Sequence, residues 1–261
     1  MSEAVHVARL NIAPVKGTAL AHPERVMLER GGVEENRRFH LVNALGRLFS
    51  GVRHGPLVTI RSSYDPEREW LELRFPDGTV VDGRADALGD DVTTVMWGRD
   101  VPGHVVDGPW SDAVSEFVGQ PVRLIRSEEP GQGNDSYAVS MVSLASVQEL
   151  SAQAGLDQPL DSRRFRMLVE IDGVAAHEED RWIGCSVEVG GAVVRVVRPD
   201  PRCVVTEQDP DTGIRDFDTR KAIRAYRPSS DGDADMGVYA DVVQPGPVAV
   251  GDPVSVRASR R

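Results

Sequence analysis

The feature that most constrains this fold is a succession of short apolar segments separated by turns rich in glycine and proline. Segments with alternating or β-branched apolar residues are typical of strands. The predicted strands are Val5–Ile12, Arg37–Val42, Leu57–Ser63, Trp70–Phe75, Thr79–Val81, Val122–Arg126, Met167–Ile171, Ser186–Val189, Val193–Val197 and Val254–Arg257. Pro76-Asp77-Gly78 and Gly190-Gly191 are each predicted to link two strands as a hairpin. The pattern therefore predicts a mainly β protein.

Helices are expected at three places. Ser111–Val118, Ser143–Ala154 and Thr219–Tyr226 place their apolar side chains on one face, and the first two stop at glycine. The polar, glycine-containing stretch Ser127–Ser136 is the best linker candidate. It predicts two domains, 1–126 and 127–261, of an α+β protein dominated by strands.

The charge balance limits the classes of ligand. The chain has 30 Lys plus Arg against 41 Asp plus Glu, a net charge of −11. General nucleic-acid binding needs a basic face, so we expect no nucleic-acid partner. A small anion remains compatible, because a few converging arginines can form a positive pocket on an acidic protein. With no apolar stretch near the roughly 20 residues of a membrane span, and no evident signal peptide, we expect a cytoplasmic protein.

The two cysteines, Cys185 and Cys203, cannot form a disulfide framework or supply a set of iron–sulfur ligands. Each is either a buried small hydrophobe or a single functional thiolate. Two other metal patterns fail. The acidic run that begins at Asp231 has Met236 and Val242 where a calcium loop needs Gly and Glu, and the run at His177 lacks a second histidine.

The segment Pro199–Thr206 is different. Prolines bracket a rigid bend, a Val-Val pair follows, and Cys203 lies where the bend meets the apolar pair. The adjacent Arg202 favours thiolate over thiol, and a thiolate is the ligand type suited to soft transition metals. Cys203 is therefore the candidate metal ligand, and a buried core cysteine is the alternative.

Motifs spread along the chain carry a resemblance to a known family. In the second half they are Arg164-Phe165-Arg166, Glu179–Gly184, Arg202-Cys203-Val204-Val205-Thr206, Asp209–Gly213, Gly237-Val238-Tyr239 and Val250–Val254. In the first half they are Pro14-Val15-Lys16-Gly17 and Gly31–Phe39. The second half resembles the MOSC domain of molybdenum cofactor sulfurases and of the mitochondrial amidoxime-reducing component. The first half resembles the N-terminal β-barrel domain of the same family.

The resemblance implies two packed β-barrel-like halves with peripheral helices, and a molybdenum–molybdopterin cofactor between them. Cys203 matches the metal ligand. Lys16, Arg37 and Arg166 match the basic residues that hold the pterin phosphate. Arg202 lies beside the ligand, and Tyr239 falls where the family has a residue near the site. Each basic residue could instead be an exposed cation, and Arg163 and Arg164 are expected to pair with local acids such as Asp161.

The resemblance also implies an activity: reduction of N-hydroxylated or N-oxide small molecules by oxygen-atom transfer at the metal. No flavin or iron–sulfur motif is present, so the electrons would come from a separate donor protein of the reductase or ferredoxin type. The alternative is a carrier module that binds the cofactor without turnover or holds a persulfide on Cys203.

Some positions depart from the family pattern. Gly17 stands where Ser is common, Asn36 where Asp is usual, Met167-Leu168 where Pro-Asn is frequent, and Pro201 where Ser often precedes the Arg-Cys pair. Gly17 and Leu168 therefore predict fewer polar contacts to the cofactor.

Overall fold

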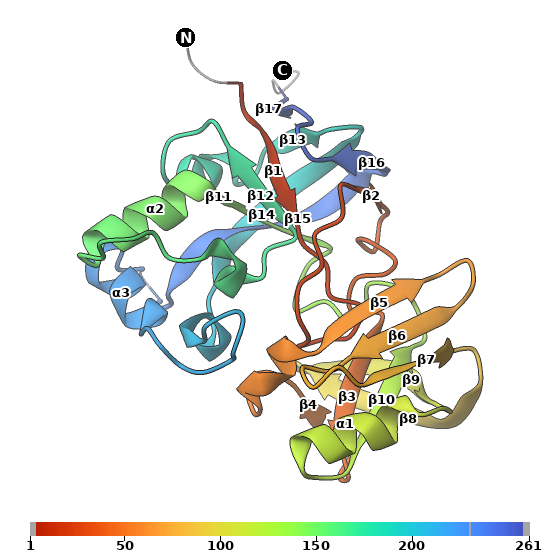
Figure 1. Ribbon diagram of the computed structural model, residues 1–261. Helices are drawn as coiled ribbons and strands as arrows, with labels where there is room; N and C mark the ends of the chain where they lie inside the picture. Colours follow the sequence, from red (N-terminus) through yellow and green to blue (C-terminus); the bar gives the residue numbers. More distant parts are fainter. Residues whose placement is uncertain (1–3, 230, 258–261) are drawn as a thin grey trace.

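The computed structural model describes residues 4–229 and 231–257, which form two lobes built mainly of strands (Figure 1). One lobe contains the first two strands and the second half of the chain. The other lobe contains the residues between these two segments, including the first helix. The expectation of a mainly β protein with a barrel-like sheet is confirmed.

The first lobe is organised around a seven-stranded sheet that is almost closed. Its spatial order is β1 (His6–Leu10), β12 (Val169–Asp172), β11 (Val139–Ser143), β15 (Asp235–Gln244), β14 (Ala192–Pro201), β13 (Ser186–Val189) and β17 (Val254–Val256). The two edges meet where His6 bridges Pro253 and the Val254 amide donates to the Val5 carbonyl at 2.9 Å. Closure removes exposed strand edges and encloses an apolar core that includes Val7, Met141 and Val196.

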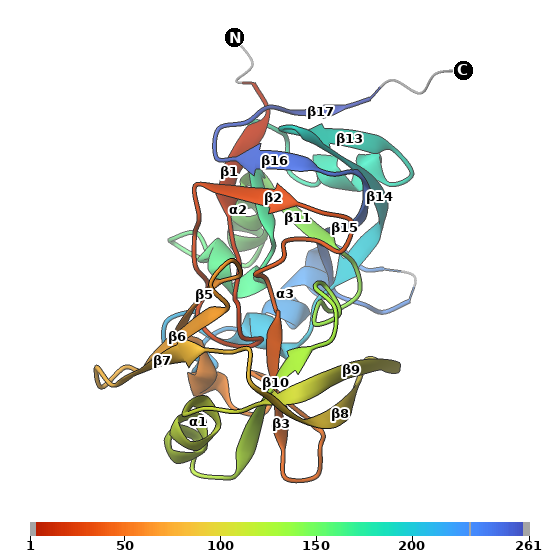
Figure 2. The ribbon, with the colours of Figure 1, turned by 90° about the vertical axis from the view of Figure 1, so that its right-hand side faces the viewer.

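A two-stranded pair extends this lobe. β2 (Arg25–Leu28) lies antiparallel to β16 (Gly246–Ala249), and Figure 2 shows the pair beside β14. Val26, Leu28 and Val248 are buried in the same core as the barrel strands. The start of the chain is therefore part of the lobe formed by its end.

The second lobe contains two smaller sheets around its own apolar core. The five-stranded sheet has the order β4 (Leu48–Phe49), β3 (Phe39–Asn43), β10 (Val122–Ser127), β9 (Arg99–Val106) and β8 (Leu88–Met96). The three-stranded sheet is β5 (Arg61–Asp65), β6 (Trp70–Arg74) and β7 (Val80–Arg84). Along β6, Leu71 and Leu73 are buried, Glu72 between them is half-buried, and the flanking Trp70 and Arg74 are exposed, as the alternation predicts.

Three α-helices lie on the periphery of the described chain. They are α1 (Trp110–Val118), α2 (Leu144–Gln153) and α3 (Thr219–Tyr226). Their positions agree with the three predicted helices. The side chain of Ser143 caps α2, and that of Asp218 caps α3, by accepting backbone N–H bonds. In the stretch from residue 4 to 257 that the structure describes, no helix has the length and apolar character needed to cross a membrane.

The lobes contact each other through backbone as well as side chains. Gly55, at the start of the 3₁₀ turn η1 (Gly55–Thr59), packs against Gly213 of the other lobe. A Cβ on Gly213 would lie 2.1 Å from the Gly55 carbonyl oxygen, and Gly213 has φ +71°. Both positions therefore require glycine, since a side chain would force the lobes apart.

Several predicted elements differ from the observed ones. The expected strand Leu57–Ser63 begins at Arg61, because Pro56 starts the turn η1 instead. The expected strand Met167–Ile171 begins at Val169. Of the strands that no prediction covered, the longest are β8, β9 and β15.

Candidate functional site

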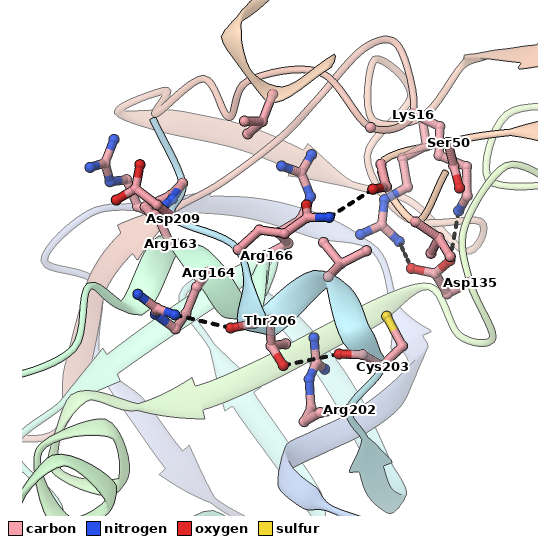
Figure 3. Close-up of a pocket in the computed structure, with 18 of the residues that line it drawn as sticks. Lys16, Ser50, Asp135, Arg163, Arg164, Arg166, Arg202, Cys203, Thr206 and Asp209 are labelled. Atoms are coloured by element: carbon pink, nitrogen blue, oxygen red, sulfur yellow. Dashed lines mark hydrogen bonds and ion pairs between the residues drawn. The ribbon is translucent and has the colours of Figure 1, made fainter. Parts of the chain in front are cut away.

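A cavity between the two lobes collects most of the candidate residues (Figure 3). About 780 Å³ of space, open solvent included, lies within this cavity and its mouth. Its lining includes Lys16, Gly17, Arg37, Ser50 and Trp97 from the first half of the chain, and Asp135, Arg166, Arg202, Cys203 and Gln208 from the second. The fold thus brings five of the six predicted site residues to one cavity. Tyr239 is the exception.

Cys203 lies where the long strand β14 ends. It precedes the 3₁₀ turn η4 (Val204–Glu207), and its carbonyl accepts bonds from the Thr206 amide at 3.2 Å and the Thr206 hydroxyl at 3.0 Å. These bonds hold the backbone, and the Cys203 thiol forms no disulfide. Cys203 is exposed, whereas Cys185 is half-buried next to β13. The thiol presented to the cavity is that of Cys203.

Lys16 and Arg37 form the cationic end of the cavity. Lys16 as a whole is only 6% exposed, and its ammonium donates a hydrogen bond to the Gly133 carbonyl at 2.9 Å. Burial, followed by the nearby Arg37, lowers the pKa of Lys16 to about 8. Arg37 has a left-handed backbone, φ 55°, with its amide bonded to the Ala13 carbonyl at 2.8 Å. A non-glycine residue in this conformation is uncommon and is held here by surrounding structure.

Asp135 is a residue of the candidate site that the sequence reasoning missed. Its carboxylate binds the Lys16 ammonium and the Arg37 guanidinium, each at 2.7 Å, and accepts from the Trp97 indole at 3.1 Å. Burial by itself would raise the pKa of Asp135, but Arg37 and Lys16 outweigh it and hold that pKa well below its usual range. Arg99 donates to the Asp135 carbonyl at 3.0 Å. The stretch expected as a linker therefore supplies an anion to the cavity.

Arg166 carries a positive charge that Asp135 offsets only at longer range, without an ion pair. It ends the 3₁₀ turn η2 (Ser162–Phe165) with φ 53°, and its guanidinium donates to the Thr18 carbonyl at 2.7 Å. Burial, followed by the positive charge of Arg37, lowers the pKa of Arg166 to about 10. It forms no ion pair with any described residue. Such a buried cation is suited to an external anion.

Arg202 and Tyr239 are tied to one buried acid, Asp200. Arg202 forms an ion pair with Asp200 and donates to the Phe165 carbonyl. Asp200 also shares a hydrogen bond with the Tyr239 hydroxyl, and burial raises the pKa of this carboxyl to about 6. Arg202 lines the cavity of Cys203, whereas Tyr239 lines a smaller neighbouring cavity with Arg37 and Arg166. Tyr239 is therefore connected to the cavity of Cys203 through Asp200 and Arg202 and does not line it.

Of the two arginines expected to pair with local acids, Arg163 does so, whereas the partner of Arg164 is distant in the sequence. Arg163 binds Asp161 at 2.6 Å and Asp211 at 2.7 Å, so the predicted Asp161 partner is confirmed. Arg164 binds a different acid, Asp216, at 3.1 Å. Figure 3 shows both arginines on the side of the cavity away from Asp135 and Lys16.

The departures from the family pattern are packed rather than open. Met167 and Leu168 are buried, at 0% and 4% exposure, in two different apolar clusters. A Cβ on Gly17 would meet the Gly51 amide nitrogen at 3.2 Å. Met167 and Leu168 thus fill the protein interior, whereas Gly17 lines the cavity without a side chain, so none of the three provides an additional polar side chain there.

The structure defines a class of protein: a two-lobed β protein with one exposed thiol inside a cationic cavity between the lobes. The MOSC domain model matches residues 128–255, and the model of the MOSC N-terminal beta barrel domain matches residues 4–121. The chain belongs to the MOSC family.

Curated relatives carry the names of one group within that family. The chain is 33% identical to the human protein named mitochondrial amidoxime reducing component 2, over 95% of this chain and 82% of the relative. It is 30% identical to the mouse mitochondrial amidoxime-reducing component 1, over 95% and 81%. Among solved structures, the YUAD protein from Bacillus subtilis aligns over 99% of this chain and 98% of its own, at 12% identity and a TM-score of 0.44.

Proposed function

We propose that this protein binds a molybdenum–molybdopterin cofactor and reduces N-hydroxylated or N-oxide small molecules. The observation that carries the proposal is the exposed Cys203 thiol in a cavity that also presents Lys16, Arg37 and Arg166. The names of the relatives support the same substrate class. A cytoplasmic location remains part of the proposal.

The donor groups fit this cofactor. Among residues 4–229 and 231–257, no cluster of three or more His, Cys, Asp or Glu could hold a metal ion. A metal bound at Cys203 must therefore bring most of its own ligands, as a metal held by a pterin dithiolene does. With Asp135 counted against them, Lys16, Arg37 and Arg166 leave an excess of positive charge that matches a phosphate dianion.

The residues have separate roles in this proposal. Cys203 would hold the metal, and the three basic residues would hold the phosphate and so fix the orientation of the pterin. When bound, the cofactor supplies two-electron oxygen-atom chemistry. Arg202, fixed by Asp200 and the Phe165 carbonyl, would donate a hydrogen bond to the substrate oxygen. Tyr239 would act from behind by orienting Asp200 and, through it, Arg202.

The electrons must come from another protein, because this chain has no flavin motif and too few cysteines for an iron–sulfur cluster. A reductase or a ferredoxin is the expected donor. The substrate is a small molecule that enters the cavity from solvent.

The test is metal and pterin analysis of protein purified from a host that makes the cofactor, followed by an assay with benzamidoxime and reduced viologen. We expect molybdenum near one per chain and formation of benzamidine, with no reaction when a nicotinamide cofactor is the sole reductant. Full molybdenum loading without reduction of amidoximes, hydroxylamines or N-oxides would reject the reductase and favour the carrier.

A further inference from the structure

A second cavity lies against the first and is lined by four arginines. It encloses about 1660 Å³ of space that includes open solvent. Val58, Arg163, Arg166 and Pro210 line both cavities, so the two are neighbours with a common wall. We refer to the second cavity as the arginine cleft, after Arg61, Arg74, Arg163 and Arg166.

Two of these arginines come from one hairpin and carry like charges side by side. Arg61 of β5 is the direct cross-strand partner of Arg74 of β6. Like charges in directly opposed positions destabilise a sheet. Arg74 is partly compensated by Glu72 at 3.1 Å, but Arg61 forms no ion pair or side-chain hydrogen bond with any described residue. The pair is therefore unfavourable for the fold alone and suited to an anion.

The other two arginines approach from the opposite lobe. Arg163 is held by Asp161 and Asp211, whereas Arg166 has no carboxylate partner in the described chain. Asp211 is the one acid among the described lining residues of the cleft. Each side of the cleft thus has one guanidinium without an ion pair, although Asp211 attracts Arg61 and Asp135 attracts Arg166 at longer range, in a chain whose net charge is −11.

The pKa of a histidine that lines the cleft is lowered by neighbouring positive charges. His22 bonds to the Asn11 side chain at 2.7 Å. Its pKa is lowered by burial and then by Arg9 and Arg163, and the opposing effect of Glu170 is smaller. The imidazole is thus kept neutral in a region where positive charge predominates.

Apolar groups form the remaining walls. Leu20, Val58, Phe75 and Pro76 line the cleft beside the arginines. An inorganic ion would make no use of these surfaces, but an organic anion with a flat apolar body would bury part of itself against them. The arginines and the apolar walls together therefore favour one class of ligand, an organic molecule with an acidic group.

We infer that the arginine cleft binds the carboxylate or phosphate end of the substrate, while the N-oxygenated end lies in the cavity of Cys203. The substrate class is then an N-hydroxylated compound with an acidic substituent. Arg61 would bind the acidic group directly, since a guanidinium matches carboxylate and phosphate in a bidentate manner. This inference rests on the proposed function for the N-oxygenated end only.

The test compares benzamidoxime with 4-carboxybenzamidoxime, which differ by one charged group. Binding is measured by calorimetry on the metal-free and on the cofactor-loaded full chain, and KM is measured on the loaded protein. A charged hydrogen bond is worth about 1.5–3 kcal/mol, so we expect the carboxylated probe to bind about tenfold or more tightly. Arg61→Gln should remove this difference and leave the affinity for benzamidoxime unchanged.

Arg68→Gln is the matched control. Arg68 lies in the turn between the same two strands, and its side chain is 82% exposed and away from the cleft. Equal affinity for both probes in the unmodified protein would overturn the inference, as would an equal loss in Arg68→Gln. Competition by inorganic phosphate as strong as by 4-carboxybenzamidine would also overturn it, by showing an anion site that ignores the organic body. Arg61-dependent binding without any turnover would support the cleft and reject the reductase.

Discussion

At the scale of single residues, the two cysteines have different surroundings and should behave differently. Cys203→Ala is expected to abolish molybdenum retention, because it removes the one thiol that faces the cavity. Cys185→Ala should leave the metal content nearly intact and cost about 1 kcal/mol or less in stability, since little volume is lost. Molybdenum content per chain is the measurement, and equal loss in both variants would reject Cys203 as the ligand.

The basic residues should determine how firmly the pterin is held. Arg37→Ala and Arg166→Ala are each expected to weaken pterin retention about ten- to a hundredfold, because a charged hydrogen bond contributes about 1.5–3 kcal/mol. Lys16→Ala should have a smaller effect, since an ammonium offers no bidentate fork. Pterin released from the purified variants measures this. Wild-type content in the Arg37→Ala, Arg166→Ala double variant would show that both residues are structural.

The lowered pKa of Lys16 predicts opposite effects of pH on binding and on stability. As pH rises through about 8, Lys16 loses its charge, and retention of the phosphate should fall. The unfolded chain keeps this proton up to the ordinary pKa of 10.5, so between these values the unfolded state binds more protons. The contribution of Lys16 to the free energy of unfolding therefore rises with pH across this window.

Lys16→Arg separates this effect from other titrations, since an arginine stays charged. Pterin content after dialysis at about pH 7 and about pH 9 should fall in the unmodified protein and stay level in Lys16→Arg. An equal fall in both proteins would show that Lys16 does not set the pH dependence.

Much of the candidate site could be selected from sequence motifs, but the carboxylate paired with its basic residues could not. Lys16, Arg37 and Cys203 stand in recognisable patterns, and the structure places them around one cavity, although their roles remain predictions. Asp135 lies in a polar stretch with the composition of a linker. Its importance depends on contacts with Lys16, Arg37 and Trp97, which are distant in the sequence. A local pattern carries no information on such contacts.

At the scale of elements, the contact between Gly55 and Gly213 supports the wall of the cavity. Gly213→Ala should destabilise the protein by several kcal/mol in total, because a left-handed alanine costs about 1–2 kcal/mol and overpacking adds about 1–3. Cofactor retention should fall with it. Thermal unfolding and pterin content measure the two effects.

Gly46→Ala is the control for backbone strain. Gly46 has φ +70°, close to the +71° of Gly213, but a Cβ there would meet no atom within 4 Å. Gly46→Ala should therefore lose only the stability that the strained backbone costs, and its cofactor content should be normal. Equal destabilisation of both variants would mean that the close approach of the two lobes contributes nothing.

The elements that escaped sequence analysis have identifiable causes. Most side chains of β8 are exposed, so its sequence lacks the alternation that marks a half-buried strand. β15 contains Gly237 at φ 75°, where a Cβ would meet the Met141 carbonyl oxygen at 2.4 Å. A glycine inside a strand weakens its local signal, and here the pairing with β11 and β14 determines the conformation. Elements with a clear apolar face, such as α1, were predictable.

At the scale of the whole molecule, the second lobe is inserted into the first. Phe39, which begins this lobe, and Ser127, which ends it, are neighbours: the Ser127 amide donates to the Arg38 carbonyl at 3.1 Å. The apolar core of the lobe comes almost entirely from residues between these points. Closely spaced ends are typical of domain insertion. The sequence predicted two consecutive domains that divide at residue 126. That prediction can be tested against the inserted arrangement.

Fragments distinguish the two divisions. Residues 127–257 alone lack β1 and β2, so they should give little ordered β structure by circular dichroism. Joining residues 4–38 to 127–257 through a short glycine linker should restore a cooperative transition, because both edges of the seven-stranded sheet are then present. Folding of 127–257 alone to the same stability would favour the division at residue 126.

The pairing of β1 with β12 has a consequence for the protein during its synthesis. β1 is made before its partner β12, which follows some 160 residues later, and the segment that closes the other edge follows later still. On the ribosome, the inserted lobe can complete its own sheets while the first strand still waits for a partner. Cys203 emerges after β12. The cavity can therefore assemble only once Cys203 and the closing segment have both emerged, and cofactor can be delivered only after that.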